Sequence, residues 1–106
     1  MSFSTALTRS GNTVIITLTG ELDASTAVAF RKDIDRAAEG DVETLVLDLT
    51  DLTYLSSAGL RGLVFARQKM SDGVNIVLVK ASDEVERTIR MVGFHHSVVF
   101  ADSVPG

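Results

Sequence analysis

The chain has 106 residues, a formal net charge of −4 and no cysteine, which predicts one domain, residues 1–106, around a single core. The lack of cysteine excludes disulfides and thiolate metal sites and suits a reducing cytoplasm, and the acidic balance without a Lys/Arg cluster argues against nucleic acid as a partner. No apolar run approaches the roughly 18 residues of a membrane span, so we expect a cytoplasmic protein without a signal peptide or membrane insertion.

The beginning of the chain predicts a β-hairpin. Residues 3–9 alternate loosely between polar and apolar types, as an edge strand does, and Gly11-Asn12 predicts a tight turn. Residues 13–19 alternate strictly and are rich in β-branched side chains, which predicts a second strand. The sequence Gly20-Glu21-Leu22-Asp23 is expected to end that strand.

A helix is predicted next. Ser25 or Thr26 is expected to cap it, and Gly40 is the expected stop after a last turn near Ala38. The apolar stripe expected to face the core consists of Phe30, Ile34, Ala37 and Ala38.

The middle of the chain predicts a buried strand and a second helix. Residues 42–49 include a continuous apolar run, as in a strand buried on both faces, and Asp48 is expected to end it. A helix is expected from about Ala58 to Met70, with Arg67 interrupting its apolar stripe. The stripe consists of Leu60, Leu63, Val64 and Met70.

The last third predicts a strand over residues 74–79, a helix capped by Ser82 and ended by Gly93, and a short strand within residues 97–101. The side chains of this helix expected to face inward are those of Val85, Ile89 and Val92. The resulting order, β-β-α-β-α-β-α-β, predicts an α/β fold with a small mixed, mostly parallel sheet and an N-terminal β-hairpin.

Two adjacent serines, Ser56 and Ser57, stand where the middle strand gives way to its helix. A serine there is expected to be the helix N-cap. Its alternative role is a switch that carries a phosphate, because a helix N-terminus stabilises anions and a phosphate adds about −1.5 to −2 charges to the surface.

The sequence lacks the residue patterns of metal binding, serine hydrolysis and nucleotide binding. His95 and His96 are adjacent and diverge on either a strand or a helix, so no metal site is expected. The serines do not lie in a G-x-S-x-G sequence, which argues against a hydrolase. Gly59-Leu60-Arg61-Gly62 lacks both nucleotide-binding glycine patterns, so no cofactor is expected, and its glycines indicate close packing of a helix turn.

With metal, hydrolase and nucleotide chemistry disfavoured, the sequence favours a surface that binds another macromolecule. Functional groups of open parallel sheets gather beyond the carboxyl ends of the strands. The loops expected at that edge are residues 21–23 and 53–57.

Three segments resemble the STAS family of sulfate transporters and anti-sigma factor antagonists: Gly20-Glu21-Leu22-Asp23, Asp48-Leu49, and Tyr54 to Leu60. The resemblance covers nearly the whole chain and implies a sheet with helices mainly on one face. It further implies an anti-sigma factor antagonist. While this antagonist is unphosphorylated, it binds an anti-sigma factor and thereby frees a sigma factor. The anti-sigma factor is itself the serine protein kinase that phosphorylates the antagonist. A serine phosphatase would reset the switch.

By the same resemblance, Ser57 matches the phosphorylated serine, and Asp23 matches an acidic loop residue beside it. Ser56 stands where the family has Asp, which makes Ser56 the alternate phosphorylation site. The partner-binding residues implied are Glu21, Asp23, Thr53, Tyr54, Leu55, Ser56, Ser57, Ala58, Gly59 and Arg61. The alternative functions are a STAS subunit or scaffold of another assembly, such as a lipid-transport complex, that binds without phosphorylation, and a small enzyme that uses Ser57.

Overall fold

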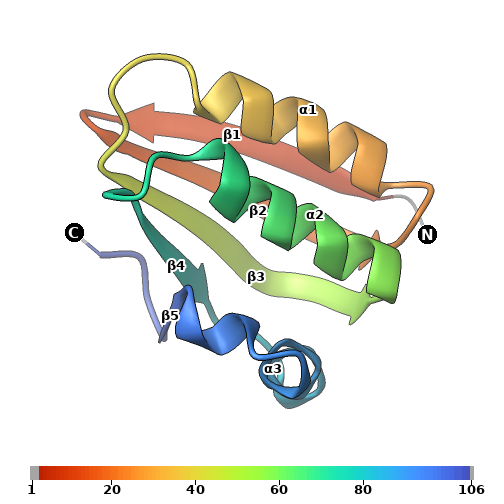
Figure 1. The fold of residues 1–106 in the computed structure, drawn as a ribbon. Helices are drawn as coiled ribbons and strands as arrows, with labels where there is room; N and C mark the ends of the chain where they lie inside the picture. The colour runs from red at the N-terminus through yellow and green to blue at the C-terminus, as the bar shows by residue number, and fades with distance from the viewer. Residues whose placement is uncertain (1–2, 106) are drawn as a thin grey trace.

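The computed structural model describes residues 3–105, whose strands form one five-stranded sheet in the order β1-β2-β3-β4-β5 (Figure 1). The elements are β1 (Ser4–Ser10), β2 (Thr13–Leu22), α1 (Ala27–Ala37), β3 (Thr44–Leu55), α2 (Ser57–Lys69), β4 (Asn75–Val79), α3 (Asp83–Met91), the 3₁₀ helix η1 (Phe94–His96) and β5 (Val99–Ala101). The β1–β2 pair is antiparallel and the other neighbours are parallel. The predicted order and sheet type are confirmed, and η1 is the one element not predicted.

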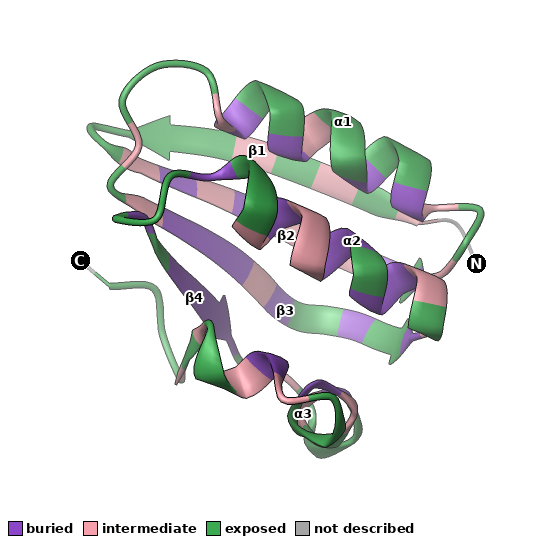
Figure 2. Ribbon diagram, in the orientation of Figure 1, coloured by how far each residue is buried: buried purple, intermediate pink, exposed green. Residues whose placement is uncertain are grey.

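Helices α1 and α2 lie side by side over one face of the sheet, and α3 lies near β4 and β5 (Figure 1). The main core fills the space beneath α1 and α2, where Figure 2 shows buried residues on both layers. Its largest fully buried side chains include Phe30, Ile16, Leu18, Leu22, Ile34, Leu45, Leu47, Leu49 and Leu63. Val46, between two of these residues in β3, joins Val77 and Val79 in a second cluster, so this part of β3 is buried on both faces as predicted.

The hairpin is confirmed and is fastened to α1. Gly11 adopts a φ of +61°, a left-handed conformation that glycine reaches without steric cost, and Ser10 pairs with Thr13 across the turn. The Thr5 hydroxyl donates to the carboxylate of Asp33 on α1. Because β1 is bonded to both β2 and α1, the edge of the sheet is fixed relative to the helical layer.

Strands β2 and β3 both extend further than the sequence indicated. Asp48 does not end β3: its carboxylate accepts the N–H of Thr50 at 3.1 Å and the hydroxyl of Thr50 at 2.6 Å, while pairing with β2 continues to Leu55. Two register shifts in this stretch leave extra residues in β3, as β-bulges do. The segments expected as loops, residues 21–22 and 53–55, are therefore the paired ends of two strands.

Val92, after α3, departs from its expected position, and Arg67, on α2, interrupts its helical stripe for a structural reason. Val92 was expected to face inward, but α3 ends one residue earlier and Val92 is 60% exposed as the C-cap. Arg67 interrupts the stripe of α2 because its guanidinium donates to the carbonyl oxygens of Val74 at 2.8 Å and Ser71 at 2.6 Å. Arg67 thus satisfies backbone groups of the connection to β4.

Candidate functional site

The candidate site lies at the carboxyl edge of the sheet, where β2 and β3 end together. Leu22 pairs with Leu55, the last residue of each strand. Helices α1 and α2 start after these strands and run back across the sheet in the same direction (Figure 1). Both helix N-termini, with their unpaired N–H groups, are thereby brought to one edge.

Ser56 is the N-cap of α2 and is held by three hydrogen bonds. Its hydroxyl accepts the N–H of Gly59 at 3.1 Å, its own N–H donates to the Leu22 carbonyl at 3.0 Å, and its carbonyl accepts the N–H of Leu60 at 2.8 Å. The expectation that a serine caps this helix is confirmed, and the helix begins one residue earlier than expected.

Ser57 is the first residue of α2 and is exposed. Its hydroxyl makes no hydrogen bond to any other group among residues 3–105. The structure therefore separates the two serines: one hydroxyl holds the helix start together, and the other is displayed at its surface.

Gly59 allows the first turn of α2 to lie directly on the end of β2. A Cβ atom on Gly59 would lie 2.2 Å from the carbonyl oxygen of Leu22, and one on Gly62 would lie 3.1 Å from the ring of Phe30 on α1. Both glycines mark close packing, as the sequence indicated. The serine pair is consequently anchored to the sheet by backbone contact.

Asp23 organises the start of α1 from within its own loop. Its Oδ1 accepts the N–H of Ser25 at 3.0 Å, the Ser25 hydroxyl at 2.7 Å and the N–H of Thr26 at 3.2 Å. The hydroxyl of Ser25, followed by the backbone of Thr26, holds the pKa of the Asp23 carboxyl below its usual value of 3.8. Asp23 thus braces the loop.

The cap predicted for α1 is corrected accordingly. Thr26 occupies the N-cap position but its side chain makes no capping bond. Its hydroxyl instead donates to the Glu21 carbonyl at 2.8 Å and accepts the N–H of Asp23 at 2.8 Å. The Asp23 carboxylate bonds N–H groups that precede the helix, and the backbone carbonyl of Asp23 accepts the N–H of Ala27, the first residue of α1, at 2.8 Å.

The bulged end of β3 turns polar groups outward beside the serines. The Thr53 hydroxyl donates to the Gly20 carbonyl at 3.1 Å, and the side chain of Tyr54 is 45% exposed. Leu55 is buried, so it contributes to the site by packing under it. The edge as a whole consists of exposed Glu21, Thr53, Tyr54, Ser57 and Arg61, half-buried Asp23, Ser56 and Ala58, and buried Leu55 and Gly59.

Val28 belongs to this edge and was missed by the sequence reasoning. It is 60% exposed, although it is the second residue of α1. The Arg31 guanidinium lies 5.2 Å from the Phe65 ring centroid, and Asp35 pairs with Lys69 at 3.5 Å, so α1 and α2 face each other with a constant offset. Val28, the second residue of α1, lies at the end of the helix that starts at this edge. Its position off the buried stripe of α1 was the available signal.

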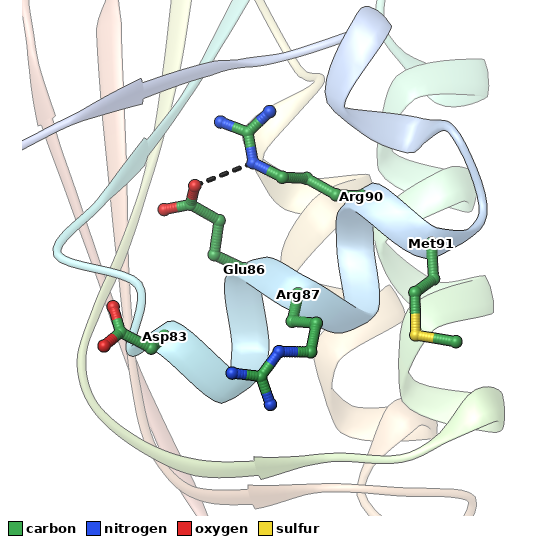
Figure 3. Close-up of a pocket in the computed structure, with 5 residues that line it drawn as sticks. All are labelled: Asp83, Glu86, Arg87, Arg90 and Met91. Atoms are coloured by element: carbon green, nitrogen blue, oxygen red, sulfur yellow. Dashed lines mark hydrogen bonds and ion pairs between the residues drawn. The ribbon is translucent and has the colours of Figure 1, made fainter.

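A separate depression of about 420 Å³ lies along α3 and is lined by Asp83, Glu86, Arg87, Arg90 and Met91 (Figure 3). Glu86 and Arg90 form an ion pair of 2.7 Å there. The depression shares no residue with the serine-bearing edge, and Glu86–Arg90 is an i, i+4 pair along one helix face.

No group of three or more His, Cys, Asp or Glu side chains within residues 3–105 is arranged to hold a metal ion. The rings of His95 and His96 lie 4.0 Å apart on η1, and burial, followed by the charge of His96, lowers the pKa of His95. No helix in the same residues is long and apolar enough to cross a membrane.

These features define an α/β domain with two helix N-termini and a displayed serine at one edge of a mixed sheet. The STAS domain model matches residues 4–105, so the chain belongs to the STAS domain family. RsfB of Mycobacterium tuberculosis, an anti-sigma-F factor antagonist, is 28% identical over 79 residues, which cover 74% of this chain and 65% of RsfB. The chain thus spans less than two thirds of that relative's length.

Solved structures share the fold. An anti-sigma factor antagonist from Mycobacterium paratuberculosis superposes with a TM-score of 0.87 at 22% identity, covering 97% of this chain and 88% of that one. SpoIIAA in its unphosphorylated form gives 0.74 at 23% identity, with 97% and 90% covered. Phosphorylated SpoIIAA from Bacillus gives 0.72 at 21% identity, with 96% and 93% covered.

Proposed function

We propose that this chain is an anti-sigma factor antagonist without enzymatic activity. In its unphosphorylated form it binds an anti-sigma factor kinase through the carboxyl edge of the sheet and thereby frees a sigma factor. The family membership supports this function, as does the likeness to RsfB, an anti-sigma-F factor antagonist. SpoIIAA, which shares the fold, has been solved in phosphorylated and unphosphorylated forms.

The observation that carries the proposal is the exposure of Ser57 at the first position of α2 with its hydroxyl free of bonds among residues 3–105. A kinase would transfer the γ-phosphoryl group of ATP to Oγ of Ser57, releasing ADP and the hydroxyl proton. The helix N-terminus stabilises the phosphate, so the fold is retained. The partner then meets about −1.5 to −2 additional charges, which weaken docking by repulsion and desolvation.

Phosphate mapping tests the site. The protein is incubated with the candidate anti-sigma factor kinase and ATP and analysed by mass spectrometry, with Ser57→Ala and Ser56→Ala as matched variants. We expect incorporation that Ser57→Ala abolishes and Ser56→Ala retains. Incorporation lost only in Ser56→Ala would move the switch to the alternate serine.

Binding measurements separate the antagonist from a permanent scaffold. Ser57→Ala is expected to bind the anti-sigma factor as the unmodified chain does, and Ser57→Asp is expected to bind more weakly with an unchanged circular dichroism spectrum. Tight binding with no phosphate on either serine, and no effect of Ser57→Asp, would favour a STAS subunit or scaffold of another assembly. The serine phosphatase of the switch is tested by recovery of binding after dephosphorylation.

A further inference from the structure

Arg61 lies one helical turn after Ser57 in the uninterrupted helix α2. Side chains spaced i, i+4 on a helix are neighbours on its surface. Both residues are exposed, so their side chains can meet without displacing any part of the core. The order, with the group that gains negative charge on the N-terminal side of the cation, is the favourable one for such a pair.

The Arg61 guanidinium has no partner of its own within residues 3–105. Apart from Arg87 on α3, the other arginines within residues 3–105 are engaged: for example, Arg36 pairs with Asp33 at 3.5 Å, Arg67 with backbone carbonyls and Arg90 with Glu86. Arg31 lies over the ring of Phe65 on the neighbouring helix. Arg61 is therefore an unused cation at the edge where the partner is proposed to dock.

We propose that Arg61 is the residue through which phosphorylation of Ser57 acts on the partner. In the unmodified chain its guanidinium pairs with an acidic group of the anti-sigma factor. After phosphorylation it binds the phosphate on Ser57 instead. The inference rests on the proposed function and deepens it, since it names the residue for which the partner and the phosphate compete.

The chemistry favours the exchange. A guanidinium offers several N–H donors in a plane and binds phosphate oxygens through two parallel hydrogen bonds. Phosphorylation then has two effects on the partner: it adds negative charge, and it removes the cation with which the partner's acidic group was paired. Glu21 and Asp23, the carboxylates of the same edge, are present before and after modification.

A first experiment needs no kinase. Phosphoserine is installed at position 57 of the full chain during translation, and the second pKa of the phosphate is measured by phosphorus NMR in the parent, in Arg61→Gln and in Arg87→Gln. We expect a phosphate pKa about 0.3 higher in Arg61→Gln than in the parent, from the energy of an i, i+4 ion pair. Arg87, exposed on α3, is the matched control and is expected to leave the value unchanged. Equal values in all three proteins would overturn the proposal.

A second experiment is a double-mutant cycle on binding to the anti-sigma factor. Arg61→Gln is expected to weaken binding of the unmodified chain about fivefold and to reduce the further loss caused by phosphoserine at position 57. If the losses of binding caused by Arg61→Gln and by phosphoserine at position 57 simply add, the proposed competition for Arg61 is contradicted. Absence of binding by every form would instead remove the proposed function and leave the phosphorus NMR result standing.

Discussion

Gly59 lies against the carbonyl group of Leu22, so closely that a methyl group on Gly59 would be 2.2 Å from the carbonyl oxygen. The same oxygen accepts the N–H of Ser56 at 3.0 Å. One backbone carbonyl of β2 therefore fixes both the N-cap and the first turn of α2. The position of the displayed serine depends on a contact between main chains.

This contact predicts that Gly59→Ala is destabilising. The added methyl must push α2 away from β2, and overpacking of this kind costs about 1–3 kcal/mol. Urea unfolding measures the loss. Gly73→Ala is the matched control, because a Cβ at Gly73 meets nothing within 4 Å. Equal stabilities of the two variants would show that α2 can shift at no cost.

The two serines are expected to differ in their contribution to folding. Ser56→Ala removes the capping hydrogen bond to Gly59 and is expected to lower the free energy of unfolding by about 1 kcal/mol. Ser57→Ala removes no hydrogen bond and is expected to stay within about 0.5 kcal/mol of the parent. Parallel urea titrations of both variants provide the comparison, and the opposite ranking would assign the cap to Ser57.

Acid should abolish the contribution of the Asp23 carboxylate. Its pKa is below 3.8 in the fold because Ser25 and Thr26 donate to the charged form, so the unfolded chain takes up a proton first. The resulting stability is present above the unfolded pKa and is lost as the pH falls through the folded value. The difference in unfolding free energy between the parent and Asp23→Asn should therefore shrink as the pH is lowered below about 3.8. A constant difference from neutral pH downward would contradict the role of the charge.

Val28 is expected to contribute to partner binding and little to folding. Covering its exposed side chain is worth about 1 kcal/mol, so Val28→Ser should weaken binding of the anti-sigma factor about fivefold. Val92→Ser is the matched control, because Val92 is equally exposed, at 60%, but lies at the end of α3. Isothermal titration calorimetry gives both affinities. Equal effects, or none at Val28, would place the partner away from α1.

The sequence predicted the element order, the sheet and the core stripes because these follow from local periodicity. Strand ends were predicted too early because Asp48 and its neighbours are polar, whereas pairing with β2 continues through the bulges. A β-bulge interrupts the regular alternation of buried and exposed residues along a strand. A stretch without this alternation is predicted as a loop, even where it is still paired. Val92 fits the helical stripe but follows the last residue of α3, where the periodicity no longer applies.

The helix start that carries the candidate site was predictable, but the difference between its two serines was not. The pair of serines marked the helix start, yet only the structure shows that Ser56 bonds Gly59 while Ser57 is displayed. The same holds for Asp23, whose bonds depend on the folded loop. The exposure of Val28 could have been predicted from its position off the buried stripe of α1, but its place at the candidate edge depends on where α1 starts relative to β2 and β3, which spacing along one helix does not show.

The antiparallel pairing of β1 with β2 has a practical consequence for experiments. Ser4 pairs with Thr19, so the first described strand starts toward the edge that carries Ser57. The tail after β5 runs toward the opposite side of the molecule (Figure 1). If the partner docks at this edge as proposed, an affinity tag or fluorophore attached ahead of β1 would compete with it for space, whereas a label on that tail would report binding without obstructing it.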